Sequence, residues 1–109
     1  MDSILITIKK LLGISEDYKQ FDTDLIIHIN SVFMVLNQLG VGPADCFVIF
    51  DDSETWDDFI TDGRKLELVK TYMYLKVKLM FDPPLSSAVI ESTNRMIDEY
   101  EWRLNVAAD

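Results

Sequence analysis

LELVKTYMYLKVKLMFDPPLSSAVIESTNRMIDEYEWRL, residues 66–104, is the stretch that decides the fold. In its first half, apolar residues recur every three or four positions, the spacing of one helix face: Val69, Met73, Val77 and Met80. The sequence Asp82-Pro83-Pro84 ends this helix, because neither proline can donate a backbone hydrogen bond. A second helix is expected to begin near Ser86, a candidate N-cap. Such a short linker predicts an antiparallel helical hairpin at the C-terminal end of the chain.

Two more helices are predicted ahead of the hairpin. Amphipathic spacing favours a helix over residues 4–12, with Gly13 as its C-cap. A longer helix is expected from Asp22, a candidate N-cap, to Leu39.

The apolar residues of this longer helix are not confined to one face, since Ile27, Met34 and Val35 lie off its main stripe. A helix on the surface of a small monomer should show a more polar outer side. Two explanations are open: either the same chain covers this helix on most sides, or the helix contacts another subunit.

The segment before the hairpin is acidic. Residues 44–50 form a loop or a short extended piece, and the following DDSETWDDFITD, residues 51–62, holds six acidic residues and no basic one. Asp52 or Ser53 is expected to cap a short helix there. We therefore predict an all-α fold: a single small domain over residues 1–109, with four to five helices and a C-terminal antiparallel helical hairpin.

Composition limits the classes of function. The chain has 109 residues, with 19 acidic side chains against 10 basic ones and a net charge of −9. Proteins that hold nucleic acid by its phosphates normally present a basic patch, which disfavours that class. An acidic surface instead keeps DNA away or meets a basic partner. No apolar run is long enough to span a membrane. Cys46 is the only cysteine, which indicates a reducing compartment and a cytoplasmic origin.

The side chains offer almost nothing for catalysis. His28 is the only histidine and lies one turn from Asp24, but no nucleophile accompanies the pair. The acidic run at 51–62 lacks the spacing of a calcium-binding loop, so a solvated acidic face is favoured over a metal site. Cys46 is expected to fill a small space in the core. We expect no enzyme activity, no catalytic residue, no cofactor and no metal.

Lys76 stands out because it falls among the apolar residues of the first hairpin helix. Burying an unpaired lysine is costly. Its ammonium group therefore either reaches water along an apolar stem, which we favour, or pairs with a carboxylate. A sharper hypothesis places Lys76 or Lys78 against the acidic segment of a neighbouring copy. On this hypothesis we assign four residues to a subunit interface: Asp57, Asp58, Lys76 and Lys78.

Three stretches carry a resemblance to a known family: YMYLKVKLMFDPPLSSAVIESTNRMIDEYEWRLN (residues 72–105), HINSVFMVLNQLGVG (residues 28–42) and ETWDDF (residues 54–59). They resemble the small head-tail connector proteins of long-tailed bacteriophages, also called head-completion proteins or DNA-packaging adaptors. The likeness covers nearly the whole chain. Its most specific part is the hinge LKVKLMFDPP followed by a helix that ends in EWRL.

The resemblance implies an all-helical structural protein of the virion. Such proteins form rings, commonly of about a dozen subunits, beneath the portal protein at the capsid vertex. The ring extends the DNA channel, through which DNA passes without sequence-specific binding, and it joins the capsid to the next neck, stopper or tail protein. The resemblance also implies synthesis in the cytoplasm of a bacterial host and a final place at the head-tail junction.

In this family the region of the C-terminal helix is associated with portal docking. Carried onto this chain, the portal contacts fall around residues 95–105, with these anchors: Arg95, Trp102, Arg103 and Leu104. Ordinary core packing is the alternative for Trp102, because tryptophan is highly buried on average. The residues expected to line the channel are Asp51, Asp52 and Glu54.

Two other functions compete with this one. An acidic DNA-mimic inhibitor would explain the charge, but not the excess of apolar residues or the hinge. A small helical regulator that binds DNA directly would need a basic recognition helix, against which the acidic excess argues. Mass measurement separates the two main candidates, because a mimic should run as a monomer or dimer and a connector should form rings, alone or on meeting its portal.

Overall fold

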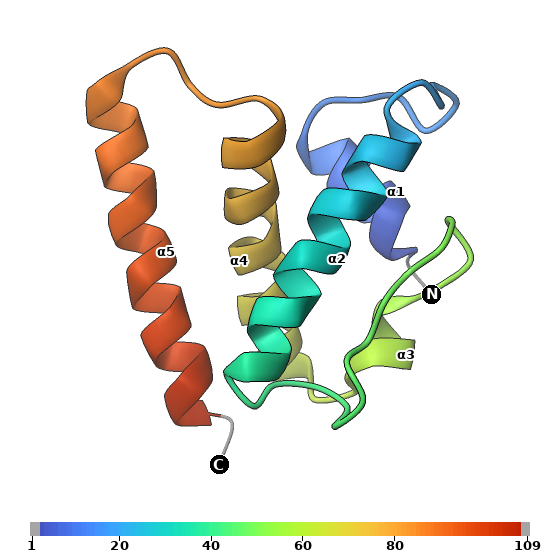
Figure 1. Ribbon diagram of the computed structural model, residues 1–109, viewed down its shortest axis with the longest axis vertical. Helices are drawn as coiled ribbons and strands as arrows, with labels where there is room; N and C mark the ends of the chain where they lie inside the picture. The colour runs from blue at the N-terminus through green and yellow to red at the C-terminus, as the bar shows by residue number, and fades with distance from the viewer. Residues whose placement is uncertain (1–2, 108–109) are drawn as a thin grey trace.

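The computed structural model describes residues 3–107 and is built from helices, as Figure 1 shows. Their bounds are α1 (Ile4–Leu11), α2 (Asp22–Gln38), α3 (Trp56–Phe59), α4 (Gly63–Phe81) and α5 (Ser87–Ala107). Over residues 3–107 the extended pairing is limited to an isolated antiparallel bridge between Ser3 and Thr55. The prediction of an all-α fold with four to five helices is confirmed.

The other helices are assembled around α4. This helix packs against α1, α2 and α5, and α5 runs back antiparallel to it along one edge of the molecule (Figure 1). The linker of residues 82–86 joins the two helices, so the predicted helical hairpin is confirmed. The molecule is a flat slab of 36 × 35 × 20 Å.

The core lies between α2 and α4. The residues that form it are buried: Leu25, Ile29, Val32 and Leu36 from α2, and Val69, Tyr72, Met73 and Val77 from α4. Along its 21 residues, by contrast, α5 buries Ile97 and Leu104 alone. Most of the surface of α5 therefore faces solvent.

The short helix α3 begins later than the sequence predicts. Its N-cap is Thr55, not Asp52 or Ser53, and the backbone N–H of Thr55 donates to Oδ2 of Asp58 at 2.9 Å in a capping box. This reciprocal arrangement satisfies two backbone donors at once, which favours it over a single side-chain cap. The start of α5 directly after Ser86 agrees with the sequence.

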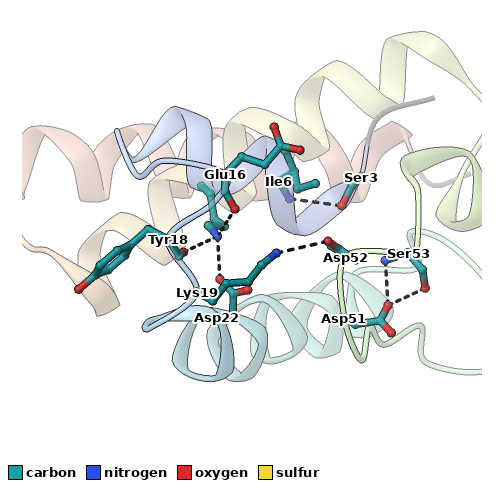
Figure 2. A network of polar contacts seen from close by, with 10 residues as sticks. Ser3, Ile6, Glu16, Tyr18, Lys19, Asp22, Asp51, Asp52 and Ser53 are labelled. Carbon is teal, nitrogen blue, oxygen red and sulfur yellow. Dashed lines mark hydrogen bonds and ion pairs between the residues drawn. The ribbon is translucent and has the colours of Figure 1, made fainter.

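A buried lysine ties α1 to α2 (Figure 2). The side chain of Lys9 is 1% exposed, and its ammonium group lies 2.9 Å from the carboxylate of Asp22. The same group donates to the backbone carbonyl oxygens of Glu16 at 3.1 Å and Tyr18 at 2.6 Å. Asp22 is thus the first residue of α2 and not its N-cap, a position that Phe21 occupies. These contacts fix the loop between the two helices.

The segment that follows α2 is fixed from two sides. The side-chain amide of Asn30 accepts from the N–H of Ile49 at 2.8 Å and donates to the carbonyl oxygen of Ile49 at 3.0 Å. Beneath it, the rings of Phe33, Phe47 and Phe59 pack with centroids 4.8 to 5.5 Å apart. Residues 44–50 are therefore a loop that is held against α2.

Candidate interaction surfaces

The outward side of α5 carries residues that the sequence assigns to portal docking. Trp102 is 68% exposed, so core packing, the alternative for this residue, is wrong. Arg95 and Arg103 are exposed on the same helix, and each pairs with a glutamate one turn earlier, Glu91 at 3.7 Å and Glu99 at 3.1 Å. Exposed pairs of this kind stabilise a helix by only about 0.5 kcal/mol. Both guanidinium groups can therefore exchange their partners at little cost.

Leu104 does not belong to this surface, which corrects its assignment as a portal anchor. Its side chain is completely buried. On an amphipathic helix, Leu104 falls on the same side as Ile97, which faces the core, while Trp102 points away. Arg95, Trp102 and Arg103 remain as candidate anchors.

The first part of the acidic segment, residues 51–55, lies between α2 and α3 and keeps its shape through its own carboxylates. The carboxylate of Glu54 accepts from the backbone N–H groups of Phe50 at 3.0 Å and Asp51 at 3.3 Å. The carboxylate of Asp51 accepts from the hydroxyl and the N–H of Ser53 at 2.5 and 2.8 Å (Figure 2). Both hydrogen bonds lower the pKa of the Asp51 carboxyl group, and the bond from the Ser53 hydroxyl has the larger effect. The segment is exposed and charged, yet ordered.

The residues predicted at a subunit interface lie on separate elements. Asp57 and Asp58 are exposed on α3, whereas Lys76 and Lys78 lie on the C-terminal half of α4. Lys78 pairs with Asp82 one turn later at 3.1 Å. Within residues 3–107 no ion pair joins the two sets, so a contact between them requires two copies of the chain.

Lys76 faces a polar group between α4 and α5. Its ammonium group lies 4.0 Å from the carboxylate of Glu101, and its side chain is 30% exposed. The hydroxyl of the buried Tyr72 donates to the same carboxylate at 2.7 Å. Burial, and then the hydrogen bond and the charge of Glu101, raise the pKa of Tyr72 well above its usual range. Both expectations for Lys76 hold in part, since it keeps access to water and also has a carboxylate within reach.

The outer side of α2 is left uncovered by the rest of the chain. Ile27 and Met34 are exposed, and Val35 is partly buried. The first explanation for the apolar residues off the stripe, cover by the same chain, is therefore wrong for Ile27 and Met34. Contact with another subunit stays a prediction.

Charge is divided unevenly between elements. The helix α4 holds five basic residues and one acidic residue, a net charge of +4. Residues 44–62 hold seven acidic residues and no basic one, a net charge of −7. A chain with a net charge of −9 thus keeps one basic helix beside a strongly acidic segment.

A family model described as phage connector protein matches residues 4–109, which is nearly the whole chain. The chain belongs to this family of phage head-tail connectors. Membership makes the connector a virion component that associates with portal and tail proteins. Neither the curated proteins nor the solved structures include a significant match.

Other site types find no support in the part of the connector that the structure describes. Across residues 3–107 no three His, Cys, Asp or Glu side chains are grouped so as to hold a metal ion. None of the described helices is both long and apolar enough to cross a membrane. Cys46 is exposed and does not fill the core, contrary to the prediction. The loop that carries it leaves the side chain outside the aromatic cluster.

Sequence reasoning missed the partner of Lys76 in the connector, although a signal for it was present. Glu101 comes four residues after Ile97 and three before Leu104. This spacing places its carboxylate on the inward side of the second hairpin helix, toward the first. The two hydrogen bonds between the Asn30 side chain and the backbone of Ile49 had no comparable signal in the sequence, because they depend on the path of a loop.

Proposed function

We propose that this connector forms a ring of identical copies beneath the portal, extends the DNA channel and joins the capsid to the next neck or tail component. The observation that carries the proposal is Trp102, which is left 68% exposed on one edge of the slab. Exposed tryptophans flanked by arginines are typical anchors of protein interfaces. The resemblance to head-tail connectors implies about a dozen subunits in the ring, a closed cyclic assembly.

Different surfaces of the subunit would contact different partners. Arg95, Trp102 and Arg103 on α5 would contact the portal, with the indole ring filling an apolar pocket and the guanidinium groups pairing with carboxylates. Ile27 and Met34 lie on a different element and are also exposed. A subunit between two neighbours needs more than one contact surface, and this distribution supplies them.

The acidic segment is proposed to serve two contacts in the ring. Asp57 and Asp58 would face Lys76 and Lys78 of a neighbouring copy, which the opposite charges of residues 44–62 and α4 support.

Asp51, Asp52 and Glu54 would line the channel, where like charge discourages tight contacts with DNA phosphates. Screening limits that repulsion to about 8 Å at physiological salt. The role of the protein is structural, and no catalytic step is assigned to it.

Cryo-electron microscopy of the purified chain mixed with its cognate portal protein tests this proposal. The expected result is a closed ring of density, coaxial with the portal and attached through one end of each subunit. A chain that stays monomeric and ignores the portal would refute the connector assembly. If that monomer instead bound the DNA-binding groove of a host enzyme, the acidic DNA-mimic function would replace it.

A further inference from the structure

Phe50 is presented to solvent on a rigid support. Its side chain is 77% exposed, more than any other aromatic side chain of residues 3–107. Ile49 beside it is completely buried and is held at both backbone groups by Asn30. The N–H of Phe50 itself donates to the carboxylate of Glu54 at 3.0 Å. The ring of Phe50 therefore buries little apolar surface within its own chain. Because its backbone is already held in place, Phe50 loses little conformational freedom on binding.

The opposite part of the molecule carries a hollow between α4 and α5. It has a volume of about 270 Å³, and its apolar wall is formed by Leu79, Met80 and Ile97. Met80 is exposed although it continues the core-facing stripe of α4. Its exposure shows that α5 leaves this end of the stripe open. The other lining residues, Lys76, Asn94, Asp98 and Glu101, are polar or charged, so an aromatic side chain in the hollow would lie against the apolar wall.

The two features cannot meet within one chain. The segment that carries Phe50 runs along one edge of the slab beside α2 and α3, while α5 forms the other edge (Figure 1). A projection on one edge and a hollow on the other are the parts of a head-to-tail contact, in which each copy uses two different surfaces. Repetition of such a contact closes a ring when the rotation between copies divides a full turn.

Charge favours one orientation of the contact. Phe50 leads into residues 51–62, which hold six acidic residues and no basic one. The α4 wall of the hollow contains Lys76, with Lys78 two positions further along α4, whereas the α5 wall contains Asp98 and Glu101. The acidic segment is therefore attracted to the α4 side, where Lys76 and Lys78 would exchange Glu101 and Asp82 for carboxylates of the neighbouring copy, and it is repelled from the α5 side.

We propose that Phe50 of one copy inserts into the hollow between α4 and α5 of the next copy, with Asp57 and Asp58 facing Lys76 and Lys78. This inference rests on the proposed ring and names the residue that anchors one subunit to the next. The occupant of the hollow is thus a second copy of this chain.

Cross-linking tests the contact directly. In a Cys46→Ser background, Asp52→Cys is combined with Asn94→Cys, which lies in the wall of the hollow. Asp52 is exposed and lies two positions after Phe50, so the Phe50 ring itself is kept. A short bis-maleimide is then added to assembled connector bound to its portal. We expect a ladder of cross-linked oligomers on a denaturing gel. The matched control combines Asp52→Cys with Ser92→Cys, an exposed α5 residue that does not line the hollow, and we expect at least tenfold less ladder from it.

The outcomes separate the two proposals. Rings that form without the ladder between positions 52 and 94, or with an equal ladder in the control, overturn the role of Phe50 and leave the ring intact. A cross-link from position 52 to the portal also overturns it, since the contact of this loop is then with another protein. Failure to assemble on the portal at all, with Cys46→Ser as the sole change, overturns the ring and this contact with it. As a second measurement, Phe50→Asp should lower the fraction of connector in rings at least tenfold, while Val48→Asp in the same loop should not.

Discussion

The ammonium group of Lys9 lies 2.9 Å from the carboxylate of Asp22, and the two side chains are 1% and 20% exposed. Because Lys9 also donates to two backbone carbonyl oxygens of the loop that follows α1, one cation organises the chain between α1 and α2. Its solvation in water has been replaced almost entirely by these three oxygen partners. The arrangement makes the pair sensitive to loss of either member.

Asp22→Asn is predicted to lower the free energy of unfolding by about 3 kcal/mol, because it leaves a buried ammonium group without a counter-charge. Urea unfolding followed by helical circular dichroism measures this change. Lys19→Met is the matched control, since Lys19 is an exposed lysine whose partner Asp52 lies 3.9 Å away. That surface pair should contribute less than about 1 kcal/mol. Equal effects from the two variants would contradict the structural role of Lys9.

Gly42 and Gly13 provide a second matched pair. Both have positive φ, +91° and +80° respectively, but a Cβ at Gly42 would collide with the ring of Phe59, while a Cβ at Gly13 would meet nothing within 4 Å. Gly13→Ala should therefore lose only the roughly 1–2 kcal/mol of the left-handed backbone. Gly42→Ala should lose about 1–3 kcal/mol more, since the aromatic cluster must also shift. Thermal unfolding compares the two variants, and similar midpoints would show that Phe59 moves aside freely.

The parts of the fold that the sequence predicted correctly depend on local signals. The hairpin followed from Pro83, Pro84 and the apolar stripes on either side of them, since a proline break acts wherever it stands. The burial of Leu104 could also have been predicted, because it continues the stripe of Ile97 and Tyr100. The assignment of Leu104 to the portal contact was wrong because it did not take this spacing into account.

The parts that could not be predicted depend on residues distant in sequence. Lys9 is buried because the loop carbonyl groups of Glu16 and Tyr18 turn toward it, and no periodicity encodes the path of a loop. The exposure of Ile27 and Met34 is a related case. An apolar residue off the main stripe indicates burial, but it does not say whether the cover comes from the same chain or from another one.

Tyr72 makes the stability of the connector depend on pH in the alkaline range. Burial, together with Glu101, raises the pKa of Tyr72, so the folded state retains the phenolic proton at a pH where the unfolded state begins to release it, about 10. The stabilisation is complete below that pH and is lost as the pH rises above it.

We therefore expect the free energy of unfolding of the native sequence, measured in urea, to fall relative to that of Tyr72→Phe above about pH 10, by no more than about 1.4 kcal/mol per pH unit for one proton. At neutral pH the native sequence should be the more stable of the two proteins, because Tyr72→Phe loses a hydrogen bond that contributes about 1 kcal/mol. A constant difference between the free energies of unfolding of the two proteins across this pH range would refute the raised pKa of Tyr72.

Trp102→Ala should separate binding from stability. Because Trp102 is 68% exposed, its removal should change the free energy of unfolding by no more than about 0.5 kcal/mol. If Trp102 anchors the portal contact, the same change should weaken portal binding by at least about 2 kcal/mol, which is roughly 30-fold in the dissociation constant. Tyr18→Ala is the control, since Tyr18 is an exposed aromatic residue in the loop between α1 and α2, away from α5. Surface plasmon resonance with immobilised portal measures both variants, and unaltered binding by Trp102→Ala would show that the portal docks elsewhere on the slab.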